Sequence, residues 1–421
     1  MTSRLASTAG RSIPVLVVAG VLVAALSLRG PIVSPTPVLR DISTDLGLSS
    51  ASAGLLTTAP VLMFALLTPL AALVIRRAGA ELALLMSLSG VLLGTVIRAL
   101  PGFGSMLAGM VVIGAAITIG NVVVPVIIRR DVPPARAGFV TAAYTAMLNA
   151  GSLVTSLLTA PLATAIGWSA ALLAWSVITI GGVVLWSVHL ARSRGGGERY
   201  SGDERVPGSV RQDLDPAVVT GPMPVVLTRE RTVLRRPVTW LLVAAFGIQT
   251  TMYYSLSTWL PTIAADELSL DRTASGAIAS LYQGCAIAGS LLVPLLTRYT
   301  PRIVPIAVIA GSWLTLTTGL LAAPELLWLW LSIGAIGHAG GFIVIFTALV
   351  GVARDAAEAG TMSALVQGVG YALGALGAPG LGALHEATGG WTVPLATIMV
   401  LSIGYCIVLF AAIVASWRAV R

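Results

Sequence analysis

Long hydrophobic runs alternate with short polar segments along almost the whole chain. Each run is about 20 residues long, the length that an α-helix needs to cross a lipid bilayer. The runs before the middle of the chain cover residues 13–38, 51–75, 81–100, 104–128, 138–165 and 168–190. Those after it cover residues 237–263, 273–297, 303–322, 326–351, 360–384 and 392–417. The pattern predicts an all-α membrane protein with twelve transmembrane helices in two six-helix bundles.

The segment between the two sets of runs is polar. It holds three consecutive glycines from residue 195 and nine arginines, a composition typical of a solvated linker. We therefore divide the chain into an N-terminal tail (1–12), a first bundle (13–190), a linker (191–236), a second bundle (237–417) and a C-terminal tail (418–421).

The two bundles also repeat one another at an offset of about 222 residues. Gly54 corresponds to Gly276 and Arg76 corresponds to Arg298. Parallel repeats of six helices are typical of the major facilitator fold, in which the substrate site lies near the bilayer midplane between the halves. The repeat therefore predicts that the first, fourth, seventh and tenth helices line a central path.

Composition supports a membrane protein and excludes several other classes. Hydrophobic residues make up 56% of the chain and charged residues only 10%, against about 25% charged residues in soluble proteins. The basic residues are all arginines, so the lysine of an ATP-binding Walker A loop is absent. Cys285 and Cys406 lie in apolar runs and suit packing. We expect no metal site, no cofactor, no nucleic-acid partner and no enzymatic activity.

The arginines predict the orientation of the chain, because basic residues concentrate in cytoplasmic loops. With the N-terminus inside, 21 of the 25 arginines lie on the cytoplasmic side. Arg40, Arg98 and Arg272 fall on the outer side, and we expect Arg98 to snorkel at the outer end of the third helix. Both termini are thus predicted to be cytoplasmic, in a multi-pass protein of the plasma (inner) membrane.

Arg29 is the one arginine that this orientation leaves inside the membrane. A charge at the centre of a transmembrane helix costs roughly 2.5–3.5 kcal/mol and usually faces a partner or a water-filled path. No Asp or Glu lies in the middle of any hydrophobic run, so no buried ion-pair partner is visible. We interpret Arg29 as a substrate-binding residue. The alternative is that it caps carbonyl groups loosened by Pro31 and Pro35.

The other expected lining helices also carry polar residues near their middles. Asn121 lies on the fourth helix, Gln249 and Tyr253 on the seventh, and His338 on the tenth. We predict that they bind substrate with Arg29, and that His338 is the candidate for proton coupling. Each also has a structural alternative: Asn121 could satisfy the carbonyl group freed by Pro125. Gln249 and Tyr253 could hydrogen-bond between helices, and His338 could bond a neighbouring backbone group. A second tier of candidates comprises Tyr144, Trp259, Gln283, Gln367 and Tyr371.

Local segments resemble the cyanate/2-nitroimidazole permease family (CynX/NimT type) of the major facilitator superfamily. The segments that carry the resemblance are residues 48–58, 120–125, 259–261, 370–371 and 385–391. The resemblance implies that Arg29 and Gln249 match the arginine and glutamine on the first and seventh helices of the family. The chain departs from the family at His338, where the family often has glutamine.

We therefore expect a secondary or facilitated transporter, acting as a monomer on a small anion or a small polar nitro-heterocycle. The fixed cation and the lack of intramembrane carboxylates favour such a solute. A multidrug efflux transporter of apolar compounds is the alternative, but the usual acidic proton carrier and fifth-helix signature are missing. A non-transporting receptor would be expected to carry a soluble output domain, and the linker is too short and polar to be one.

Overall fold

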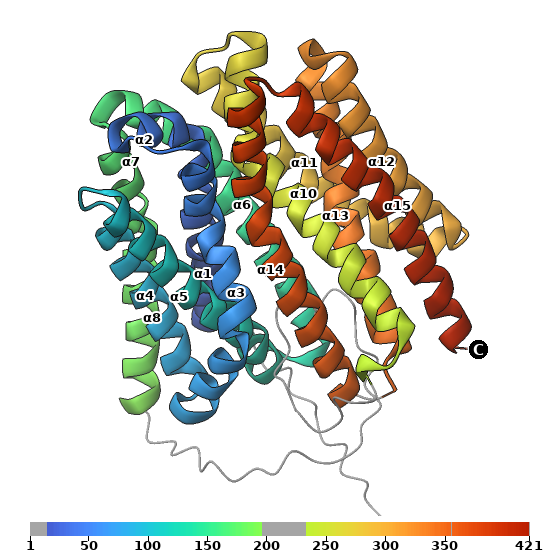
Figure 1. Ribbon diagram of the computed structural model, residues 1–421. Helices are drawn as coiled ribbons and strands as arrows, with labels where there is room; N and C mark the ends of the chain where they lie inside the picture. The colour runs from blue at the N-terminus through green and yellow to red at the C-terminus, as the bar shows by residue number, and fades with distance from the viewer. Residues whose placement is uncertain (1–14, 196–232, 355, 421) are drawn as a thin grey trace, which may run out of the picture.

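The computed structural model describes residues 15–195, 233–354 and 356–420, and these residues form helices arranged in two halves (Figure 1). The N-terminal half contains α1 (Val15–Val33), η1 (Thr36–Val38), α2 (Leu39–Leu46), α3 (Ser50–Ala78), α4 (Ala80–Arg98), α5 (Phe103–Asp131), α6 (Pro134–Ile166), α7 (Trp168–Ala174) and α8 (Ser176–Gly195). The C-terminal half contains α10 (Pro237–Leu268), α11 (Arg272–Tyr299), α12 (Ile303–Ala322), η3 (Pro324–Leu326), α13 (Leu327–Val352), α14 (Ala356–Thr388) and α15 (Thr392–Val420).

The helices confirm the all-α architecture that hydropathy predicts. Within the described residues, 11 spans are long and apolar enough to cross a membrane. The remaining long helix is α10, which has 32 residues and packs beside α11 and α14. Its central turns contain Gln249, Thr250, Thr251, Tyr253 and Tyr254, polar residues that lower the hydropathy of this helix. The predicted tail (1–12) and most of the predicted linker (191–236) lie outside the described residues.

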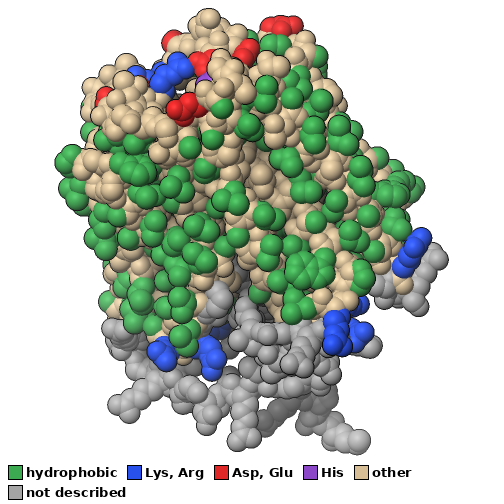
Figure 2. All heavy atoms as spheres, viewed as in Figure 1, with side chains coloured by type: hydrophobic (Ala, Val, Ile, Leu, Met, Phe, Trp, Pro, Cys, Tyr) green, Lys and Arg blue, Asp and Glu red, His purple; other side chains and the backbone are tan. Residues whose placement is uncertain are grey.

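We name the two ends of the molecule by the chain segments found there. The linker end is where α8 finishes and α10 begins, and the distal end is where α1 passes through η1 into α2 (Figure 1). On the face shown in Figure 2, acidic side chains gather at the distal end beside some basic ones, and basic side chains mark the linker end, with a hydrophobic belt between the two ends. This charge distribution is the one expected of a protein that crosses a bilayer.

The two halves each have a hydrophobic core, and they meet along α3 and α14 and along α6 and α11. Glycines permit the close approach. A Cβ atom on Gly54 of α3 would lie only 2.6 Å from the backbone of Ala378 on α14. In the interior, the ring of Tyr371 contacts Phe64 of the N-terminal half at 5.5 Å and Phe246 of the C-terminal half at 5.3 Å between centroids.

Ion pairs fasten the halves together at the distal end. Arg40 of α2 pairs with Asp266 at the end of α10. Asp41, the next residue of α2, pairs at 2.6 Å with Arg272 at the start of α11. Among the described residues, the ion pairs that join the two halves all lie at this end. The structure is therefore closed at the distal end by contacts between charged side chains.

The position of Arg98 corrects the prediction that it snorkels to the outer membrane face. Its side chain is fully buried, at 0% exposure, inside the N-terminal half. It donates hydrogen bonds to the carbonyl oxygens of Pro31 and Leu172 and to the hydroxyl of Ser34. Unpaired backbone carbonyl groups at helix breaks offered enough hydrogen-bond acceptors to hold the cation inside the protein.

Candidate substrate-binding site

Arg29 lies in the last turns of α1 and reaches across to the C-terminal half. Its Nη2 donates a hydrogen bond to the hydroxyl oxygen of Tyr253 on α10, at 3.3 Å. The guanidinium carbon is 5.9 Å from the centroid of the Tyr253 ring, within the range of a cation–π contact. The side chain is half-buried, and no carboxylate contacts it in the described part of the chain. Arg29 is thus a cation without a counter-anion at the boundary between the halves.

Tyr253 is held in place within the C-terminal half by a hydrogen bond and by a ring stack. Its hydroxyl donates to Gln283 Oε1 on α11 at 3.2 Å, and Gln283 Nε2 contacts Ser257 Oγ at 3.4 Å. Its ring stacks on the imidazole of His338 on α13, with 3.9 Å between centroids and 7° between the planes. The hydroxyl therefore accepts from Arg29 and donates to Gln283, which fixes both its position and its orientation.

Aromatic side chains from several helices surround the charge of Arg29. The guanidinium interacts electrostatically with Tyr253, Tyr254, His338 and Tyr371 of the C-terminal half and with Tyr144 of α6. We call these five residues and Arg29 the Arg29 cluster. The hydroxyls of Tyr144, Tyr254 and Tyr371 make no hydrogen bond within the described residues, so their hydrogen-bonding capacity is unused.

Gln249 lies one turn before Tyr253, but its side chain is engaged elsewhere. Its Nε2 donates to the backbone oxygen of His338 at 2.8 Å, and its Oε1 accepts from the hydroxyl of Tyr405 on α15 at 2.9 Å. The residue is only 2% exposed. The close packing requires Gly341 on α13, where a Cβ atom would lie 2.6 Å from Gln249 Oε1. The structure thus places Gln249 behind His338, where it supports the Arg29 cluster without facing it.

Asn121 is half-buried on α5. Its side chain makes no hydrogen bond within the described residues, and none links it to Arg29. It lies one turn before Pro125, which interrupts the hydrogen bonding of α5. The structure therefore brings Arg29, Tyr253 and His338 together and leaves Asn121 outside their hydrogen-bond network.

The second-tier residues divide between three places. Tyr144, Gln283 and Tyr371 belong to the surroundings of Arg29, as described above. Gln367 donates to Ser363 Oγ at 2.8 Å, and its Oε1 is buried without a partner in the described structure. Trp259 lies near the distal end, where its indole nitrogen donates to the backbone oxygen of Ala378 at 2.9 Å.

Sequence reasoning missed two aromatic residues of this region. Tyr254 packs edge-on against Tyr253, with 4.9 Å between centroids. Tyr282 stacks near Tyr253 at 6.1 Å, and its buried hydroxyl has no partner among the described residues. Each lies next to a residue that the sequence does single out, Tyr253 or Gln283. The available signal was the adjacency of each tyrosine to a polar residue already singled out on the same helix.

The chemistry of the site follows from these contacts. It offers one fixed cation, several hydroxyl groups, a flat aromatic stack and no carboxylate in contact with them. Such a set suits a planar solute that carries negative charge or electron-rich oxygen atoms, because guanidinium groups bind such atoms with paired hydrogen bonds. In the described part of the chain, no group of three metal-binding side chains is present.

Comparisons with known proteins agree with this architecture. The family model of the Major Facilitator Superfamily matches residues 15–379. The chain is 30% identical over 391 residues to a protein from Escherichia coli (strain K12) named 2-nitroimidazole transporter, covering 92% of this chain and 93% of that protein. It is 24% identical to the Cyanate transport protein CynX of the same organism, covering 87% of this chain and 89% of that protein.

The fold is also that of a solved transporter structure. The crystal structure of a bacterial homologue of the human lysosomal transporter Spinster, in an inward-facing and unoccupied conformation, matches with a TM-score of 0.66 at 16% sequence identity. The match covers 97% of this chain and 98% of that one. At this identity the likeness concerns the arrangement of the helices.

Proposed function

Because this chain belongs to the Major Facilitator Superfamily, we propose that it transports a small anionic or nitro-heterocyclic solute by alternating access, with Arg29 binding the solute. One observation carries the proposal. Arg29 reaches the boundary between the halves, has no carboxylate partner in the described residues and contacts Tyr253 of the opposite half. The free energy of placing a cation in such a position is unfavourable unless an anionic or electron-rich ligand binds to it.

The solute class is supported by the groups around the cation. The stacked pair of Tyr253 and His338 offers a flat aromatic surface beside Arg29, and the free hydroxyls of Tyr144 and Tyr371 can hydrogen-bond to oxygen or nitrogen atoms. The names of two relatives, a 2-nitroimidazole transporter and a cyanate transport protein, belong to the same chemical class. Efflux of apolar compounds is less well supported, because a fixed charge in the binding site would disfavour such ligands.

Alternating access requires that the halves separate at one end while they meet at the other. The two ion pairs that join the halves in the described residues lie at the distal end, so we infer that the structure is closed there. The arginine-rich linker end would be cytoplasmic, with both termini inside and the protein in the plasma membrane. Binding of the solute between Arg29 and Tyr253 would then contact both halves and favour their rearrangement.

The proposal is tested by uptake into vesicles that contain the purified protein. We would measure transport of 2-nitroimidazole and of nitrate by the parent protein, Arg29→Gln and Arg29→Lys. Loss of a hydrogen bond to a charged group costs about 1.5–3 kcal/mol, so the glutamine variant should transport roughly 10- to 100-fold less efficiently. The lysine variant should retain part of the activity, because it keeps the charge and loses the planar geometry.

The matched control is Arg418→Gln, which removes an exposed arginine near the end of α15. It should transport like the parent. Equal transport of both solutes by Arg29→Gln and the parent would refute the role of Arg29.

A further inference from the structure

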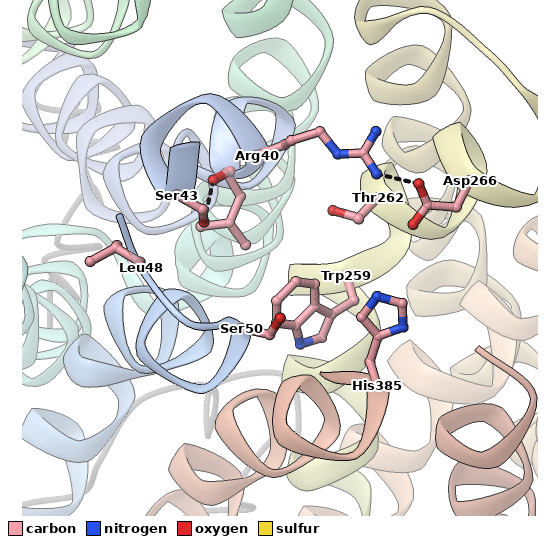
Figure 3. A pocket seen from close by; sticks show the side chains of 9 residues that line it. Arg40, Ser43, Leu48, Ser50, Trp259, Thr262, Asp266 and His385 are labelled. Atoms are coloured by element: carbon pink, nitrogen blue, oxygen red, sulfur yellow. Dashed lines mark hydrogen bonds and ion pairs between the residues drawn. The ribbon is translucent and has the colours of Figure 1, made fainter. Parts of the chain in front are cut away.

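A second polar pocket lies between the halves at the distal end, away from the Arg29 cluster (Figure 3). Arg40 and Ser43 line it from the N-terminal half, and Trp259, Asp266 and His385 line it from the C-terminal half. Its cavity volume is about 150 Å³, which leaves room only for a solute smaller than the usual drug-sized ligand. The pocket therefore exists only while the two halves are in contact at this end.

Several polar groups of the pocket lack partners. Arg40 donates through Nη2 to Asp266, and its other N–H groups make no hydrogen bond within the described residues. The hydroxyl of Thr262 and the imidazole of His385 likewise have no hydrogen-bond partner there, and Nδ1 of His385 is buried. Water can satisfy the exposed Arg40, so the buried Nδ1 of His385 is the group here whose missing partner points to a ligand.

Flat aromatic rings form another part of the pocket. Figure 3 shows the indole of Trp259 next to the imidazole of His385, below the Arg40–Asp266 pair. The imidazole stacks on Trp391 at 4.0 Å between centroids, which fixes the plane of its ring. The pocket shares an arginine and flat rings with the Arg29 cluster, but its arginine is paired with a carboxylate, that of Asp266.

Asp266 occupies the place at Arg40 that a ligand anion would take. Its Oδ1 accepts from Arg40, and its Oδ2 accepts from the indole nitrogen of Trp391 at 2.9 Å. The Arg40 side chain is 61% exposed, so an ion from solution can reach it without unfolding any element. An anion that binds Arg40 would compete with Asp266 and weaken one of the two ion pairs that close the distal end.

From these contacts we propose that the distal pocket is a second binding site for the same class of small anionic or nitro-heterocyclic solute. Occupancy of the pocket exchanges the Arg40–Asp266 pair for an Arg40–ligand pair while the two halves stay in contact at the distal end. The site gives the solute a first point of contact on the path to Arg29. The inference rests on the proposed function for the class of solute.

The test measures protection of an engineered cysteine in the pocket. Cys285 and Cys406 are replaced by alanine, and Thr262→Cys provides the reporter, whose rate of reaction with a maleimide is measured on detergent-solubilised protein. We expect 2-nitroimidazole and nitrate, added separately, each to slow the reaction at least fivefold. Ser43→Cys places a reporter cysteine on the opposite wall of the pocket. This variant replaces Thr262→Cys in the experiment if Thr262→Cys does not fold.

Two further substitutions separate the distal pocket from the Arg29 cluster. Protection should persist when Arg29→Gln is added, because that change removes only the central cation. Protection of the cysteine should disappear when Arg40→Gln is added, because that change removes the cation of the distal pocket. The matched control is Arg272→Gln, which breaks the other ion pair between the halves but does not line the pocket, and which should keep the protection.

Removal of the internal competitor provides a quantitative check. Asp266→Asn should lower the concentration that gives half-maximal protection several-fold, whereas Asp41→Asn should leave it unchanged. Loss of protection in Arg29→Gln alone, or full protection in Arg40→Gln, would overturn the distal site. Protection of the cysteine without transport in vesicles would refute the proposed function but not the binding site in the distal pocket. Transport in vesicles without protection of the cysteine would refute the distal site and leave the proposed function.

Discussion

The guanidinium of Arg98 donates a hydrogen bond to the backbone oxygen of Pro31, with 2.7 Å between Nη1 and the oxygen. The helical partner of that oxygen would be the N–H group of residue 35, and this residue is a proline, which has none. Arg98 supplies the shorter of the two hydrogen bonds that replace it, and the hydroxyl of Ser34 donates the other at 3.4 Å. Arg98 Nη2 also donates to the backbone oxygen of Leu172, beside the break between α7 and α8. One buried side chain thus joins α4 to two helix ends.

Substitution of Arg98 should therefore reduce stability. Arg98→Gln would remove the short hydrogen bonds to the Pro31 and Leu172 oxygens and leave the Pro31 oxygen only the longer contact from Ser34, at a cost of about 1–3 kcal/mol. We expect a lower midpoint of thermal unfolding in detergent than for the parent protein. Arg418→Gln, which changes an exposed arginine, should unfold like the parent. Equal midpoints for all three proteins would show that Arg98 is not needed to hold these helix ends.

Two tyrosines that lie near each other should respond differently to the loss of a hydroxyl group. The hydroxyl of Tyr253 joins Arg29 to Gln283, whereas the buried hydroxyl of Tyr282 has no partner among the described residues. Tyr253→Phe keeps the stack on His338 but frees the guanidinium, so KM for 2-nitroimidazole uptake should rise roughly 10-fold. Tyr282→Phe should leave KM unchanged. Equal KM values for the two variants would contradict the role of the Tyr253 hydroxyl.

The sequence alone predicts most of the fold, because the length and spacing of apolar runs directly reflect the thickness of the bilayer. It also identifies Arg29, since a charge inside an apolar run is conspicuous. Tyr253 and His338 follow from their depth on helices expected to line the path, and the structure places both beside Arg29.

What the sequence could not supply is the partner of each side chain. Arg98 falls near the end of an apolar run, and its depth alone suggests a snorkelling residue. Only the tertiary structure shows that Pro31 and Leu172 present carbonyl oxygens to it. Gln249 shares a helix face with Tyr253, but a face does not specify whether a side chain points to the path or between helices.

Gln249 should consequently behave as a packing residue more than as a ligand. Gln249→Leu would leave the hydroxyl of Tyr405 without its acceptor and the backbone oxygen of His338 without its donor. We expect a loss of about 1–3 kcal/mol in stability, measured as a lower unfolding midpoint, with a smaller rise in KM than in Arg29→Gln. Tyr405→Phe should produce a similar but milder loss of stability. A large rise in KM at an unchanged unfolding midpoint would instead make Gln249 a direct ligand.

The pH dependence of transport tests whether His338 carries a proton. A protonated His338 would add a second cation near Arg29, with no carboxylate in contact with either residue in the described structure. We therefore expect the neutral imidazole to be the working form across about pH 5–8, the range in which histidine usually titrates. Nitrate uptake, whose solute stays ionised throughout, should then show the same pH profile in the parent protein and in His338→Gln. KM should be higher at every pH in the variant, because the ring stack on Tyr253 is lost. A titration step present in the parent and absent from the variant would instead establish His338 as a proton carrier.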